Sequence, residues 1–278
     1  MRRTIPLFVA GLLAGPALAQ HDHRAELAVS WTQQPLLLPE SGRRQRDVAG
    51  LRAVGINASS LSVHAPAGEP AVRQREFSLS DGSARISSAG PQIGNYHWVV
   101  LREASPAGIR VASTAWYFSN PGASPEELLA TPKHELEIVP QPLPREHGQY
   151  RESEKWPFLV RLYGKPLAGQ RLLLETEFGS RSQFVTDGEG IATVLFPRDF
   201  PPPPTEQAGG HGRPSAAFVL STEHAEGEHR YQTAFNLRYG PDADRGRSLA
   251  WGAAFGLAGM LAAAPLLRRR QNREVPHA

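Results

Sequence analysis

The sequence has no cysteine among its 278 residues. This absence excludes disulfide bonds, a thiolate zinc site, a cysteine nucleophile and a lipidated cysteine. The motifs of common enzyme classes are missing as well: there is no Gly-x-Ser-x-Gly, no phosphate-binding loop, no dinucleotide fingerprint and no His-Glu-x-x-His. We therefore expect a protein that is not an enzyme, in which any metal site uses nitrogen and oxygen ligands.

Residues 1–19 have the form of a secretory signal peptide. Two arginines precede an apolar run, and the segment ends in Ala17-Leu18-Ala19. Cleavage after Ala19 and cleavage after Gln20 both fit this pattern. A short N-terminal membrane anchor is the alternative, but the small residues at the end of the segment favour cleavage and export.

A second apolar segment lies near the C-terminus, at residues 249–267. It carries no charge, and as a helix it would be about 28 Å long, close to the hydrocarbon thickness of a bilayer. Four arginines follow within residues 268–273, which places the tail 268–278 in the cytoplasm. The alternative, a buried core helix, leaves the arginines unexplained. We predict one transmembrane helix in the cell inner membrane, with the bulk of the chain in the periplasm.

The net charge of +3 belongs to the two ends of the chain. Of the 30 Lys and Arg residues, six lie in the leader and the tail, which leaves 24 between residues 20 and 247. Of the 27 Asp and Glu residues, all but Glu274 lie in that same stretch, which leaves 26 and a net charge of −2. A nucleic-acid partner is not expected, because binding to phosphates requires a basic surface.

Short β-rich runs alternate with turn clusters through the exported part, and 26 glycines and 25 prolines favour turns over long helices. We predict an all-β fold of two Ig-like or transthyretin-like β-sandwich domains, at 20–120 and 135–240, plus the C-terminal transmembrane helix. Linkers are expected at 121–134, with a short helix at 124–129, and at 241–248. The predicted strands are 26–31, 51–56, 61–65, 72–79, 96–101, 109–118, 135–139, 158–163, 171–176, 183–186, 191–196, 216–222 and 230–238.

Candidate metal ligands open the mature chain, in the order Gln20-His21-Asp22-His23. A terminal amine, backbone amide nitrogens and an imidazole at the second or third position form a tetragonal nitrogen set, which suits Cu(II) and Ni(II). The carboxylate of Asp22 adds an oxygen ligand or a hydrogen bond to a ligand. The alternative is a solvated N-terminus whose histidines bind nothing.

A second candidate cluster lies between the last two predicted strands. If residues 225–228 form the loop, His224 and His229 face each other with Cβ atoms about 5 Å apart, and His211 is a further candidate ligand. The alternative is a polar hairpin tip. His97 lies on a predicted strand, where a packed or hydrogen-bonded histidine is the alternative to a metal ligand.

The segments 136–140 and 158–163, with Gly164-Lys165-Pro166-Leu167-Ala168-Gly169 and Thr186-Asp187-Gly188-Glu189-Gly190, resemble a family of bacterial periplasmic β-sandwich proteins. That family has no single assigned function, and it includes periplasmic components of nickel- and cobalt-uptake transporters of the energy-coupling type. The resemblance covers most of the chain in layout and 136–196 in motif.

This resemblance implies a membrane-anchored protein that delivers Ni(II) or Co(II) to a membrane uptake transporter. Its partners would be transporter subunits or another envelope protein, and Cu(II) and Zn(II) stay open as metals. The alternative function is a non-catalytic envelope β-sandwich that binds a partner without metal.

Overall fold

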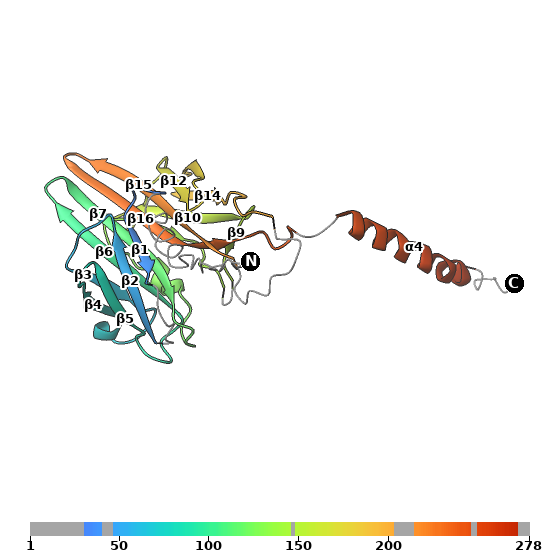
Figure 1. Ribbon diagram of the computed structural model, residues 1–278, viewed down its shortest axis with the longest axis horizontal. Coiled ribbons are helices and arrows are strands. Elements are labelled where there is room, and N and C mark those ends of the chain that lie inside the picture. Colours follow the sequence, from blue (N-terminus) through green and yellow to red (C-terminus); the bar gives the residue numbers. More distant parts are fainter. Residues whose placement is uncertain (1–30, 41–46, 146–147, 203–213, 246–248, 272–278) are drawn as a thin grey trace, which may run out of the picture.

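The structure is a computed structural model that describes residues 31–40, 47–145, 148–202, 214–245 and 249–271. In these residues β-strands dominate, and the helices are α2 (Pro70–Arg73), α3 (Glu126–Ala130) and α4 (Leu249–Gln271) (Figure 1). The expected all-β class is confirmed. The strand predicted at 72–79 begins too early: residues 70–73 form α2, because Pro70 favours a first helical turn and the N–H groups of Val72 and Arg73 donate to the Glu69 carbonyl.

Nine of the described strands form one continuous sheet. Two smaller sheets pack against it, a three-stranded sheet and a four-stranded sheet. The nine-stranded sheet runs in the order β13 (Arg181–Val185), β12 (Arg171–Thr176), β15 (Ala216–Glu226), β16 (His229–Gly240), β7 (Gly108–Tyr117), β6 (Tyr96–Ser105), β3 (Ser60–His64) and β4 (Gln74–Ser78), and β9 (Tyr150–Arg151) pairs with β16. The small sheets contain β1 (Leu36–Pro39), β2 (Val48–Val54) and β5 (Ser83–Ser87), and β8 (Leu136–Pro140), β10 (Lys155–Leu162), β11 (Lys165–Pro166) and β14 (Ile191–Leu195).

The two halves of the chain are joined by a parallel pairing of β7 with β16. The register runs from Tyr231 opposite Ile109 to Phe235 opposite Ser113. Beyond this ladder, the hydroxyl of Thr114 donates to the Asn236 carbonyl at 2.7 Å. Strands from both expected sandwiches therefore meet in one shared sheet. The domain limits themselves stay a prediction.

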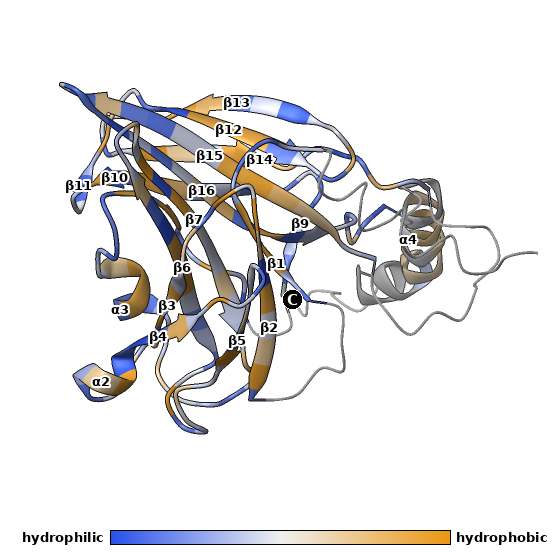
Figure 2. Cartoon of the chain, turned by 60° about the vertical axis from the view of Figure 1, so that its left-hand side comes forward, coloured by the Kyte–Doolittle hydropathy of each residue, from blue (hydrophilic) through white to orange (hydrophobic). Residues whose placement is uncertain are grey.

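The two small sheets cover opposite faces of the shared sheet. Trp98 and Val100 of β6 join one apolar cluster with β8, β10 and β14, whereas Val99 and Leu101 join another with β2 and β5. Because both faces are covered, β6 is buried at six successive positions, Tyr96–Leu101. Figure 2 shows the hydrophobic residues as orange bands along the strands of these layers.

Strand β1, which the sequence did not predict, is fixed to β16 by one side chain. The carboxamide of Asn236 accepts from the Leu37 N–H and donates to the Leu37 carbonyl, both at 2.9 Å. Leu36 packs beside this clamp against Val219 and Ala234. The amide thus makes the pair of hydrogen bonds that a neighbouring strand would make.

The two motifs that carry the family resemblance contact each other in the structure. The hydroxyl of Thr186 donates to the Leu167 carbonyl at 2.6 Å and accepts from the Gln170 N–H at 2.8 Å. The Asp187 carboxylate accepts from the N–H groups of Glu189 and Ile191, both at 2.9 Å. These residues therefore build a strand–turn–strand frame.

The apolar C-terminal segment forms the helix α4, on which Phe255, Leu257, Met260 and Leu261 expose large apolar side chains. Among the residues that the structure describes, no helix is both long enough and apolar enough to cross a membrane. The membrane-spanning role of residues 249–267 stays a prediction.

The junction of the halves gives a first prediction. Gly108 begins β7 with a φ of 138°, and a Cβ there would overlap the Arg230 carbonyl oxygen of β16. We expect Gly108→Ala to lower the free energy of unfolding of the full chain by about 2–4 kcal/mol in urea denaturation. Gly179→Ala is the control, because Gly179 also has a positive φ (90°) but has open space around it; we expect a loss of about 1 kcal/mol. Equal losses would show that the close approach does not constrain the junction.

Candidate functional site

The predicted metal ligands do not come together in the described part of the chain. His21, Asp22, His23 and His211 lie outside the described residues. Within the described ranges, no group of three or more histidine, aspartate or glutamate side chains has a metal-binding arrangement. His97, His224 and His229 therefore each have to be considered in their own surroundings.

The expected pairing of His224 with His229 was wrong. The turn contains only Gly227 and Glu228, and the register places His224 opposite Tyr231 and His229 opposite Glu226. Gly227 has a φ of 63°, a conformation that glycine adopts at no steric cost and that allows a two-residue turn. The strands therefore continue further than a four-residue loop would permit.

His97 is a packed core histidine in this structure. It is fully buried, its Nε2 accepts from the Ala89 N–H at 3.0 Å, and its ring packs edge-on against Phe118 at 4.8 Å between ring centroids. Burial, together with the charge of Arg75, lowers the pKa of His97 to about 4. These contacts favour the alternative given for this residue over a role as metal ligand.

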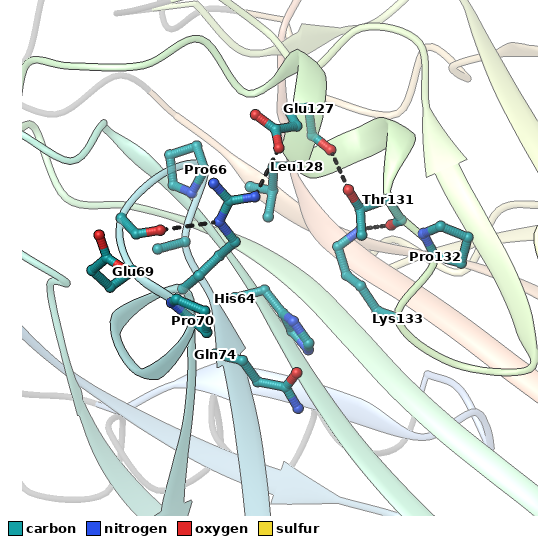
Figure 3. A pocket seen from close by; sticks show the side chains of 13 residues that line it. His64, Pro66, Glu69, Pro70, Gln74, Glu127, Leu128, Thr131, Pro132 and Lys133 are labelled. Atoms are coloured by element: carbon teal, nitrogen blue, oxygen red, sulfur yellow. Dashed lines mark hydrogen bonds and ion pairs between the residues drawn. The ribbon is translucent and has the colours of Figure 1, made fainter.

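A cavity of about 570 Å³ lies where the first half meets the link to the second half (Figure 3). One wall comes from the end of β3, the following loop, α2 and the start of β4, at residues 64–74. The other wall comes from α3 and the segment after it, at residues 127–133. We call this space the junction cavity.

Rigid elements shape both walls of the junction cavity. His64 and Gln74 are paired across the β3–β4 ladder. Pro66, Pro70 and Pro132 also line the cavity, and their fixed φ angles reduce the freedom of the loops that carry them. The backbone that forms the cavity walls therefore has little conformational freedom.

The polar groups of the cavity come from both walls. The Arg73 guanidinium forms an ion pair with Glu127 at 2.8 Å and donates from Nε to the Gly68 carbonyl at 3.3 Å. On the opposite wall, the Lys133 ammonium donates to the Thr131 carbonyl at 2.6 Å. These groups place N–H donors at the cavity from both walls.

Desolvation changes the pKa of two groups in the cavity. Burial is the largest cause for His64, whose pKa falls to about 4, with the charge of Lys133 adding to the fall. Burial also lowers the pKa of Lys133 to about 8, against the opposing effect of Glu137. At neutral pH His64 is therefore uncharged, while Lys133 is mostly protonated.

A buried ion pair holds the segment that carries Lys133. The Nε of Arg161 on β10 donates to Glu137 on β8 at 2.6 Å, and both side chains are buried. Arg161 also donates to the carbonyls of Ala130 and Thr131, at 2.7 and 2.9 Å. The Lys133 N–H donates to Glu137 at 3.0 Å, so residues 130–133 of the link are bonded to strands β8 and β10 of the second half.

His134 lies beside this ion pair, with a side chain that is only 1% exposed. Neither of its ring nitrogens has a hydrogen-bond partner, and Nε2 is 3.9 Å from a Glu137 oxygen. Burial lowers its pKa to about 4 despite the nearby carboxylate.

The sequence did not point to His64, Lys133 and His134 as a group. They come from segments about 70 residues apart and share no spacing pattern. Only the packing of the α3 segment against β3 brings them together.

No protein-family model and no curated protein matches this chain. Among solved structures it is similar to a bacterial ice-binding adhesin of 1.5 MDa, at 11% identity over 75% of this chain and 65% of that chain, with a TM-score of 0.25. It is also similar to the D0–D1 domain of intimin, at 13% identity over 74% of this chain and 97% of that chain, with a TM-score of 0.23. A segment of two fibronectin type III domains from chicken tenascin is similar at 11% identity over 73% of this chain and 98% of that chain, with a TM-score of 0.22. The chain spans less than two thirds of the adhesin structure's length, and likeness at this level identifies no ligand or partner.

The lowered pKa of His134 predicts that the folded chain loses stability in acid. An unfolded histidine has a pKa near 6.5, so between pH 6.5 and about 4 the unfolded chain binds protons that folded His134 does not, and stability falls as the pH falls. We expect His134→Leu to reduce this loss by on the order of 2 kcal/mol, measured by urea denaturation of the full chain at pH 7 and pH 4.5. His229→Leu, at an exposed position, should leave the loss unchanged. An unaltered acid loss in His134→Leu would contradict the assignment.

Proposed function

We propose that this chain is an exported, non-catalytic β-sandwich binding module, and that the junction cavity is its binding site. The observation that supports this most directly is the cavity of about 570 Å³ itself, with donor groups facing it from two distant segments. This volume lies within the range of roughly 300–1,000 Å³ typical of small-ligand sites. Such sites occur preferentially where two domains meet.

The support around the cavity favours binding without large rearrangement. The Glu137–Arg161 pair holds one wall, and the β3–β4 ladder with its prolines holds the other. A site that is already formed avoids the entropy cost of ordering loops when a ligand arrives. Thr131 carries the one hydroxyl among the residues that line the cavity, and it donates to the Glu127 carbonyl at 2.9 Å.

The proposed location is the periplasmic face of the inner membrane. The sequence of residues 1–19, the uncharged segment 249–267 and the arginines after it support this placement. The exposed apolar side chains of α4 are a further support, since such a surface is normally covered in the functional state. Alkaline extraction of membranes should retain the full chain and release a chain that ends at residue 248; release of both would contradict the anchor.

Filling the junction cavity should abolish ligand binding. Gln74 lines the cavity, and an indole at this position of β4 would occupy part of the space. We expect wild-type full chain, titrated with a fragment library of anionic, neutral and cationic compounds, to show NMR shift changes concentrated at cavity residues. Gln74→Trp should lose these shifts.

Gln183→Trp is the matched control, because Gln183 is an exposed residue on the edge strand β13. It should keep the fragment binding of the wild type. Fragment hits that scatter over the surface and respond equally to both substitutions would contradict the proposed site.

The second candidate function is delivery of Ni(II) or Co(II) to membrane transporter subunits. Its supporting observation is the Gln20-His21-Asp22-His23 sequence directly after the predicted cleavage region, outside the described residues. Calorimetric titration of the full mature chain with NiCl₂ should then show one strong site. Joint replacement of His21 and His23 by alanine should weaken it at least about tenfold, and His229→Ala should have no effect. Absence of Ni(II), Co(II), Cu(II) and Zn(II) binding would remove this candidate.

A further inference from the structure

We propose that the junction cavity recognises a carboxylate group, with Lys133 as its charge partner. This assignment rests on the proposed binding function and names the chemistry of its ligand. The ligand is an organic acid with a compact, partly apolar body, or the C-terminal carboxylate of a peptide; both present the same group to the cavity.

Lys133 has a positive charge that the described part of the chain does not pair with a carboxylate. None of the ion pairs among the described residues includes it. Of its three N–H donors, one is used by the Thr131 carbonyl. The nearby carboxylate of Glu137 accepts from Arg161 and from a backbone N–H instead.

The surroundings of Lys133 make an anion favourable at this point. Its ammonium lies 5.2 Å from the centroid of the Trp98 ring, a cation–π contact that holds the charge in place without neutralising it. A partly desolvated ammonium gains more from an opposite charge than one in bulk water, because the local dielectric constant is lower. Two of its N–H groups remain for a carboxylate oxygen.

Further donors surround the same space. Arg73 and His64 line the same space from the wall formed by residues 64–74, across from Lys133 (Figure 3). Arg73 uses two of its N–H groups for Glu127 and Gly68. Its remaining N–H groups have no partner among these bonds, and Arg73 lines the cavity.

Two carboxylates line the cavity, those of Glu69 and Glu127. Glu127 is compensated by Arg73, and Glu69 lies at the start of α2, in the wall across from Lys133. The apolar side chains of Leu128 and Pro66 also line the space, and they provide contact for the body of the ligand. The carboxylate is therefore expected at the Lys133 end.

The direct test is an NMR titration of the full chain with sodium benzoate and with benzamide, which has nearly the same shape but no charge. We expect saturable benzoate binding with shifts at cavity residues, and at least about tenfold weaker binding of benzamide. Lys133→Met should weaken benzoate binding at least about tenfold, whereas Lys165→Met, at an exposed lysine of β11, should not change it. Equal binding of benzoate and benzamide, or no effect of Lys133→Met, would overturn the proposal.

A second measurement covers the case in which Lys133→Met does not fold. In the wild type, benzoate affinity should be constant below about pH 8 and should fall by about tenfold per pH unit above it, as free Lys133 loses its proton. An affinity that does not change between pH 7 and pH 10 would also overturn the proposal. The charged and titratable groups that act on Lys133 are His64, His134, Glu137 and Arg161, and Arg73 and Glu127 line the same cavity.

The source of the carboxylate is distinguished by N-acetyl-alanyl-phenylalanine and its C-terminal amide. Tighter binding of the free-acid peptide than of benzoate assigns the peptide source, and the reverse assigns a free organic acid. If neutral fragments bind in the cavity but no acid does, the carboxylate assignment fails and the proposed binding function stands. If no fragment of any charge binds there, both fail.

Discussion

The parallel pairing of β7 with β16 is the interaction on which the rest of this structure depends. It merges strands from two halves of the chain into one sheet, with Tyr231 opposite Ile109 and Phe235 opposite Ser113. Because a single sheet runs through both halves, each of its faces must be covered, and two smaller sheets do so from opposite sides. Residues 130–133 of the link are hydrogen-bonded to Glu137 and Arg161 of the second half, and the link lines the junction cavity together with residues 64–74.

Much of the strand pattern followed from the sequence, because alternation and turn residues are local signals. Residues 171–176 were predicted with the bounds that β12 has, and the short helix near residue 126 was also found. Strand β1 was missed, since Leu36–Pro39 is short, ends in proline and is fixed by Asn236, a residue about 200 positions away. The parallel pairing of β7 with β16 could not be predicted either, because no local sequence pattern specifies which strands become neighbours.

The residues of the candidate site could not be predicted from the sequence either. The histidines that stood out did so through proximity in sequence, and a two-residue turn at Gly227 was enough to offset His224 from His229. No sequence pattern distinguishes Lys133 and His64. Their pKa values are lowered mainly by burial, and the charge of Lys133 lowers that of His64 further. Residues whose function depends on desolvation cannot be recognised until the groups that exclude water are known.

The Asn236 clamp has a consequence for how the chain reaches this structure. It joins residues 199 positions apart, so it forms only after the whole intervening chain has been made and arranged. Long-range contacts of this kind raise the contact order, and chains with high contact order fold slowly, because loop closure comes before the contacts that reward it. The first and last strands of the β region are therefore interdependent, and trimming either end removes the same pair of hydrogen bonds.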